Sequence, residues 1–243
     1  MRARLIAPLV AAVLGISGGI ATALVVPGDK AEPRASTYND PLHLDIPLVD
    51  QDCTGESLLV VGYGDTVASL GSAASGFKSK GARYLRSDDS CATALGPEGK
   101  PSPAYVVYLG PFNTRREPCE IRMSGEAGGN FFVTVLSSQE AQQVRQLVKC
   151  PCELAREARP ELFVGMIETP ESVIWTRSLQ GMLNDDDPAE FPHSAITGRY
   201  DATTAARVTD YQETAPGKLT VPGRVDTATW GIITERICRR YTY

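Results

Sequence analysis

Four short segments of alternating or continuous apolar residues follow one another in the middle of the chain, separated by turn residues and helical patterns: Leu58–Val61, Ala82–Arg86, Tyr105–Leu109 and Phe131–Leu136. Runs of this length and setting are typical of strands. Apolar residues at helical spacing lie in Val67–Lys78, and Asn113 begins a segment to Met123 that opens with cap residues. The order β-α-β-β-α-β predicts an α+β domain over residues 53–153, with a ferredoxin-like sheet and both helices on one face.

Alternation along the third strand assigns its residues to two faces. If Tyr105, Val107 and Leu109 face the helices, Tyr108 faces the open side. With Tyr84 and Arg86 on the neighbouring strand, Tyr108 is then a candidate for stacking on sugar rings and bonding their hydroxyls. The alternative is that these residues only cover a partly solvated sheet or meet another domain.

An internal repeat follows in the last part of the chain. Gly198–Thr204 (GRYDATT) and Gly223–Thr229 (GRVDTAT) share the form G-R-hydrophobic-D-x-x-T. Glycine permits a turn with positive φ, and the aspartate caps the helix that follows. Helices are therefore expected at three places and predict a small three-helix bundle over residues 172–243: Val173–Leu183, Ala202–Tyr211 and Ala228–Cys238.

These blocks resemble the peptidoglycan-binding domain of the first type, a three-helix module. The likeness rests on the L-Q pair at Leu179, the motif from Gly198 to the aromatic-Gln pair at Tyr211, and GRVDTATW from Gly223. The capping Asp and Thr residues are read as structural. Any binding is expected in the shallow groove between helices, and the candidate ligand-binding residues are Gln180, Arg199, Tyr211 and Gln212.

The middle region resembles a sporulation-related repeat (SPOR) domain, on the strand and turn YVVYLGPF from Tyr105. That family has the same order of elements and binds glycan strands stripped of their stem peptides. If this region also binds glycan, the candidates from the strand alternation above, Tyr84, Arg86 and Tyr108, are the residues expected to contact it. The acidic run from Asn184 to His193 is longer than in the three-helix family and is expected to be a solvated loop.

The first 25 residues predict a membrane anchor or a signal segment. Arg2 and Arg4 precede an uncharged stretch, Leu5–Val26, which is long enough to cross a bilayer core. Ala21-Thr22-Ala23 is also an A-x-A cleavage site, so a cleaved signal is the alternative. Residues 26–52 are rich in proline and small residues and predict an extended spacer, while residues 154–171, interrupted by prolines, predict a linker.

The charge balance and the number of histidines exclude several classes of function. The 24 Lys and Arg against 29 Asp and Glu give a net charge of −5 without a basic stripe, which argues against nucleic acid as a partner. His43 and His193 stand far apart, so a zinc hydrolase or a Cys-His enzyme is not expected, nor is any cofactor or metal. Expected partners are therefore peptidoglycan, the membrane and proteins of the cell envelope.

The even number of cysteines in a chain that is expected to be exported predicts disulfides. The ends of a ferredoxin-like sheet lie close together, so Cys53 is expected to pair with Cys150 or Cys152. The other member of this C-x-C pair then pairs with Cys238, because a bridge within C-x-C is strained. Cys91 and Cys119 remain for each other within the middle domain, a pairing that completes the predicted set.

These features favour an exported, membrane-tethered and non-catalytic protein that binds peptidoglycan and links the membrane to the wall. An extracytoplasmic interaction or regulatory protein of envelope assembly is the alternative, ahead of an accessory subunit of a wall hydrolase.

If Leu5–Val26 is an anchor, native protein will fractionate with membranes and resist carbonate extraction. A mature N-terminus at Leu24, found by mass spectrometry, would instead identify a cleaved signal.

Overall fold

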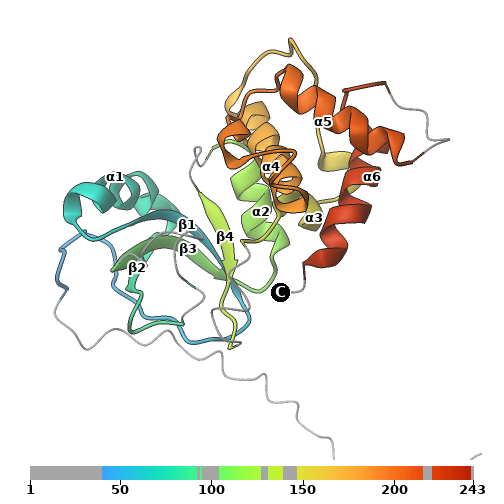
Figure 1. Ribbon diagram of the computed structural model, residues 1–243. Coiled ribbons are helices and arrows are strands. Elements are labelled where there is room, and N and C mark those ends of the chain that lie inside the picture. The colour runs from blue at the N-terminus through green and yellow to red at the C-terminus, as the bar shows by residue number, and fades with distance from the viewer. Residues whose placement is uncertain are drawn as a thin grey trace, which may run out of the picture. The chain divides into compact units, whose positions relative to one another are not determined.

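The sheet of the middle region has the expected order of elements. In the computed structural model, which describes residues 40–91, 94, 104–126, 131–138, 147–215 and 221–241, the order is β1(Ser57–Gly64), α1(Val67–Phe77), β2(Arg83–Arg86), β3(Tyr105–Phe112), α2(Arg116–Met123) and β4(Phe132–Val135). A short 3₁₀ helix, η1(Lys78–Lys80), ends α1. The strands form an antiparallel sheet in the order β2-β3-β1-β4 (Figure 1). The prediction of a mixed α+β fold with this sheet is confirmed.

Both helices of this region cover the same face of the sheet. α1 begins with a capping box in which Thr66 Oγ1 accepts from Ser69 N–H and Ser69 Oγ accepts from Thr66 N–H, at 3.3 and 3.2 Å. The core beneath the helices is apolar, and it takes alternate residues from each strand: Leu59, Val61, Val107, Leu109, Val133 and Val135, with Leu70 and Ala74 of α1 and Cys119 and Met123 of α2. The predicted helix-facing side of β3 is thus correct for Val107 and Leu109.

The opposite face of the sheet is covered as well, which corrects the expectation of an open face. A second core fills it with Leu58, Val60, Leu85, Cys91, Ala94, Val106, Tyr108, Phe132 and Leu136. The backbone from Val49 to Gln51 crosses this face, and Cys91 N–H donates to Gln51 O at 2.7 Å. The Cys53–Cys91 disulfide joins the two covering segments, with Cα atoms 5.0 Å apart.

The predicted sugar-binding cluster on this face is therefore wrong. Tyr108 does face the side away from the helices, but it is completely buried; its hydroxyl donates to Val49 O at 3.1 Å and accepts from Gln51 Nε2 at 2.8 Å. Tyr84 pairs in register with Val107 and packs in the helix-side core. Arg86 is opposite Tyr105, on the same side as Tyr84, and forms ion pairs with nearby acidic residues of its own turn.

The C-terminal module contains three α-helices in its described part: α4(Pro170–Asp186), α5(Ala202–Glu213) and α6(Thr227–Ile237). All three were predicted, and their observed ends differ from the expected ones by at most three residues. α4 begins earlier because Thr169 and Ser172 form a capping box around Pro170, which is tolerated at the first helical position. Short 3₁₀ helices, η4(His193–Ala195) and η5(Cys238–Arg240), stand before α5 and after α6.

The segment predicted as a linker packs against the helices. α3(Cys150–Glu153) directly precedes it, it contains η3(Arg156–Ala158), and both Leu154 and Leu162 are buried. Leu162 forms a two-way backbone bridge with Val225, the residue before the cap of α6. One continuous core extends from the helix-covered face of the sheet through α2 and α3 into the module. The described residues accordingly belong to one compact unit.

Three disulfides join all six cysteines, which is the number of bridges expected. The pairs differ in part from the predicted ones. Cys53 pairs with Cys91, Cys119 with Cys150, and Cys152 with Cys238. The predicted Cys152–Cys238 option and the exclusion of a bridge within the C-x-C pair are confirmed. The predicted pairing of Cys53 with that pair, and of Cys91 with Cys119, is wrong because Cys91 packs in the core on the far face of the sheet, while Cys119, a residue of α2, is buried in the core on the helix-covered face.

No helix in the described ranges is long and apolar enough to cross a membrane. The predicted span Leu5–Val26 lies outside these ranges, as do the A-x-A site and the first part of the predicted spacer. The disulfides point to folding in an oxidising compartment outside the cytoplasm.

The connectivity can be checked by peptide mapping of the native protein under non-reducing conditions. We expect the three linked pairs above, and a Cys91–Cys119 peptide would contradict the fold of the second face.

Replacing Cys152 and Cys238 together by serine should lower the free energy of unfolding by about 2–4 kcal/mol, because the bridge closes a long loop of the unfolded chain. Urea denaturation measures this change.

Candidate ligand-binding site

Each copy of the repeated motif forms a glycine turn followed by a helix cap. Gly198 and Gly223 have φ of +82° and +69°, and a Cβ on either would lie within 3.1 Å of a neighbouring side-chain atom. Asp201 Oδ1 accepts from Thr204 N–H, and Asp226 Oδ1 from Thr229 N–H, both at 2.8 Å. The predicted capping roles of both aspartates are confirmed.

A buried glutamine holds the first of these turns. Gln180 of α4 accepts from Gly198 N–H at 2.8 Å through its Oε1 atom. Its Nε2 atom donates to Arg199 O at 3.0 Å and to Thr204 Oγ1 at 2.9 Å. We call this arrangement the first glutamine clamp. Because the whole amide is engaged and buried, the prediction that Gln180 binds ligand is wrong.

The second copy has the same arrangement, with Gln212 of α5 in place of Gln180. Gly223 N–H donates to Gln212 Oε1 at 2.9 Å, and Gln212 Nε2 donates to Arg224 O and Thr229 Oγ1, each at 2.9 Å. This second glutamine clamp fixes the turn before α6 as the first fixes the turn before α5. Gln212 is therefore also a structural residue, contrary to the prediction that it contacts ligand.

Two aromatic contacts join the clamped turns to the core. Tyr200, the hydrophobic residue of the first motif, donates from its hydroxyl to Gly223 O at 2.9 Å, and burial raises the pKa of Tyr200. Trp230 donates from Nε1 to Pro160 O at 2.8 Å and packs edge-on against Trp175, with ring centroids 5.7 Å apart. The two turns thus depend on each other as well as on their clamps.

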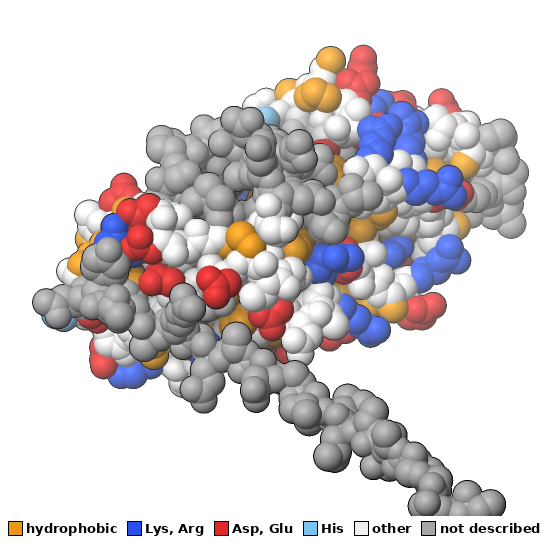
Figure 2. Space-filling model, turned by 90° about the horizontal axis from the view of Figure 1, so that it is seen from below, with side chains coloured by type: hydrophobic (Ala, Val, Ile, Leu, Met, Phe, Trp, Pro, Cys, Tyr) orange, Lys and Arg blue, Asp and Glu red, His pale blue; other side chains and the backbone are white. Residues whose placement is uncertain are grey.

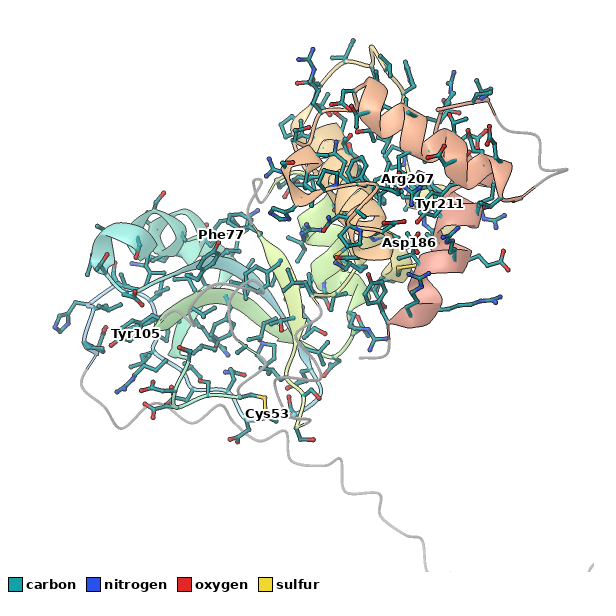
Figure 3. All side chains as sticks on the ribbon, in the orientation of Figure 1. Cys53, Phe77, Tyr105, Asp186, Arg207 and Tyr211 are labelled. Carbon is teal, nitrogen blue, oxygen red and sulfur yellow. A yellow bond between two sulfur atoms is a disulfide. The ribbon has the colours of Figure 1, made fainter. Side chains whose placement is uncertain are left out.

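Tyr211, another predicted ligand-binding residue, lies in a cluster of charged side chains (Figure 3). The guanidinium groups of Arg207 and Arg236 lie 5.3 and 4.9 Å from the centroid of its ring. Its hydroxyl donates to Asp186 Oδ2, and burial, followed by this carboxylate, raises the pKa of Tyr211. Tyr211 is buried, so the structure does not present it to a ligand.

Asp186 corrects the expectation of a solvated acidic loop. It is the last residue of α4, and its side chain is 0% exposed. Its carboxylate forms ion pairs with Arg236 at 3.1 Å and Arg240 at 2.6 Å, and Arg207 lies 4.0 Å away. A carboxylate at a helix C-terminus is unfavourable, and the arginines offset that cost. Lys and Arg side chains are frequent on the face of the C-terminal helices seen in Figure 2.

Arg199 is the one predicted candidate of the module whose charged group reaches solvent. Its side chain is 77% exposed, and its Nε lies 3.3 Å from Glu168 Oε1. Its carbonyl is held by the first glutamine clamp, so the backbone beneath this exposed side chain is fixed. Glu168 was not predicted, because it comes from the supposed linker and nothing in its local sequence indicates contact with Arg199.

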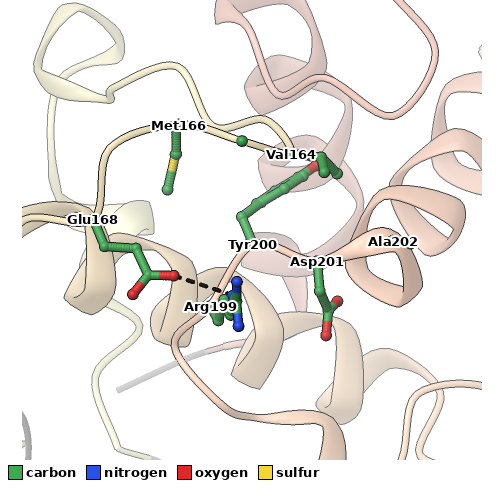
Figure 4. Close-up of a pocket in the computed structure, with 8 residues that line it drawn as sticks. Val164, Met166, Glu168, Arg199, Tyr200, Asp201 and Ala202 are labelled. Atoms are coloured by element: carbon green, nitrogen blue, oxygen red, sulfur yellow. Dashed lines mark ion pairs between the residues drawn. The ribbon is translucent and has the colours of Figure 1, made fainter.

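A cavity of about 390 Å³ adjoins this ion pair (Figure 4). It lies between the segment before α4 and the start of α5, and eight residues line it: Val164, Gly165, Met166, Glu168, Arg199, Tyr200, Asp201 and Ala202. The segment turns at Gly165, which has φ of +87°. Exposed apolar side chains stand on it, with Val164 at 56% and Ile167 at 86% exposure. We regard this cavity as the candidate binding site.

The sheet domain offers no comparable surface at its predicted site. Burial raises the pKa of the Tyr108 phenol, and burial together with Asp40 raises that of Tyr84. In the described ranges, no group of His, Cys, Asp and Glu is arranged to hold a metal ion.

A scan against protein-family models matches no family, and searches of curated proteins and of solved structures find no significant match.

The clamps can be tested on Gln212. A Gln212→Leu variant keeps the approximate shape but leaves Gly223 N–H without its acceptor and removes the donor to Thr229 Oγ1, whose own bond to Arg224 O remains. Because each buried unsatisfied group costs about 1–3 kcal/mol, we expect the free energy of unfolding to fall by about 3 kcal/mol in urea denaturation. The neighbouring Glu213→Leu, at an exposed position, is the control and should change it by less than about 0.5 kcal/mol.

Proposed function

We propose that this chain is an exported, non-catalytic protein that binds peptidoglycan through its C-terminal module. The observation that carries the proposal is the cavity beside Arg199, on a three-helix module whose two repeated turns resemble the motif of peptidoglycan-binding domains of the first type. Concave sites with a few convergent polar groups and apolar walls are typical of small-ligand binding. The cavity combines one cation, two carboxylates and the apolar residues Val164 and Met166.

The sheet domain supports the module in this proposal and does not bind glycan through its sheet. Its order of elements is that of a ferredoxin-like split βαβ unit, and we infer a SPOR-like origin from the strand that ends at Phe112. A buried Cys119–Cys150 disulfide ties α2 to α3, and Cys152–Cys238 ties α3 to the end of α6. These bridges hold the module against the sheet domain.

The N-terminal segment completes the proposal as the tether. Leu5–Val26 would hold the protein in the membrane and leave the disulfide-bonded part on the outer side. The protein would then connect the membrane to the wall. No catalytic step is part of the proposal: of the two histidines, His43 precedes the sheet and His193 lies in η4, and both are exposed.

One observation favours the second candidate, a protein-interaction role in envelope assembly. Val164, Ile167 and Val221 are each more than half exposed, and Phe163 is also partly exposed. Apolar side chains on a protruding segment are often contact points for another protein. The two functions differ in whether purified wall alone is enough for binding.

Sedimentation with purified sacculi tests the proposal, using the compact unit Pro33–Tyr243. We expect the wild type to sediment with the wall. Ala202→Trp should reduce the bound fraction at least about fivefold, because Ala202 is exposed at the start of α5 and the indole would fill the cavity.

The matched control is Ala206→Trp, which places the same side chain at an exposed position of the same helix outside the cavity lining. It should bind as the wild type does. No sedimentation of the wild type would remove the proposed function. Equal losses in the two variants would show that binding does not use this cavity.

A further inference from the structure

The candidate site has two opposite charges side by side at its wall. Arg199 Nε and Glu168 Oε1 are 3.3 Å apart, and the side chains are 77% and 51% exposed (Figure 4). An exposed ion pair of this kind adds little to the stability of a fold. Both groups also keep bonding capacity, since a guanidinium has five N–H donors and a carboxylate has about four acceptor positions. The pair is therefore available to a ligand.

The rest of the wall favours a ligand with a short apolar chain. Val164 and Met166 line one side, and the ring of Tyr200 is fixed by the hydrogen bond from its hydroxyl to Gly223 O. The N-terminus of α5 does not offer a free anion site, because Asp201 already accepts from Thr204 N–H and Thr204 Oγ1. A ligand carboxylate thus has Arg199 as its partner in the lining, and a ligand cation has Glu168.

From this arrangement we propose that the cavity binds the zwitterionic end of an uncross-linked stem peptide. The inference rests on the peptidoglycan-binding function proposed above. A diamino-acid residue of such a stem ends in an ammonium and a carboxylate on the same carbon. The ammonium would pair with Glu168 and the carboxylate with Arg199, so that four alternating charges form a closed ring. The methylene groups of the side chain would lie against Val164 and Met166.

The pairing makes the site sensitive to cross-linking. Cross-linking acylates the amine at this end of the diamino acid, which removes the positive charge and adds bulk. Glu168 would then face a neutral amide in place of an ammonium, and the ring of charges is broken. The protein would accordingly favour wall whose stems still have free ends over mature, fully cross-linked wall.

Calorimetric titration of the unit Pro33–Tyr243 with synthetic stem tetrapeptides tests this inference. The probes are the tetrapeptide with meso-diaminopimelate, the same peptide acetylated on the side-chain amine, and the same peptide amidated on the side-chain carboxylate. We expect each modification to weaken binding by about tenfold or more. Glu168→Gln should abolish the discrimination against the acetylated peptide, and Arg199→Glu the discrimination against the amidated one.

Arg239→Glu is the matched control, since Arg239 is also 77% exposed and pairs with a glutamate, Glu235, at 3.2 Å. It changes the net charge as Arg199→Glu does and should leave all three affinities unchanged. Equal binding of the three peptides to the wild type would overturn the inference. If Ala202→Trp still reduced sedimentation with sacculi, the proposed function would stand with another wall epitope, whereas no sedimentation of the wild type would remove both.

Discussion

The C-terminal module depends on two buried glutamine side chains. Turns that begin with glycine place an N–H and a C=O towards the interior, and buried backbone groups of this kind must find partners. A glutamine amide supplies an acceptor and donors at once, so Gln180 satisfies Gly198 N–H and Arg199 O from one position. The same bonds fix the backbone at the cavity wall. The side chain of Arg199 is exposed, while its carbonyl and the capped start of α5 are bonded to the same glutamine amide.

The disulfides explain why sheet and module behave as one unit. Cys119–Cys150 and Cys152–Cys238 meet at α3, a single helical turn, and so bring α2 of the sheet domain and the end of α6 to the same short segment. The apolar core continues through this junction. The cavity beside Arg199 therefore belongs to a unit that is held together by both disulfides and core packing.

The local sequence pattern was sufficient to predict the helices and strands, but it was not sufficient to predict which of their faces are exposed. Alternation along β3 correctly separated Val107 from Tyr108, because successive side chains of a strand point to opposite faces. It contained no information about what covers each face. The segment that buries Tyr108 comes from before β1 and from the loop after β2, and the register of β2 places Tyr84 on the other side. A ligand face was therefore predicted where the protein has a second core.

The sequence by itself determined what lies within one turn of the chain. Asp201 and Asp226 cap their helices, and Gly198 and Gly223 make their turns, because these roles need only partners three residues away and a residue that tolerates positive φ. Tertiary structure decided the roles that need distant partners. The burial of the Gln180 and Gln212 amides, the pairing of the cysteines and the contact between Glu168 and Arg199 all depend on it. Such contacts join residues far apart in the chain, and no local pattern specifies them before the core has packed.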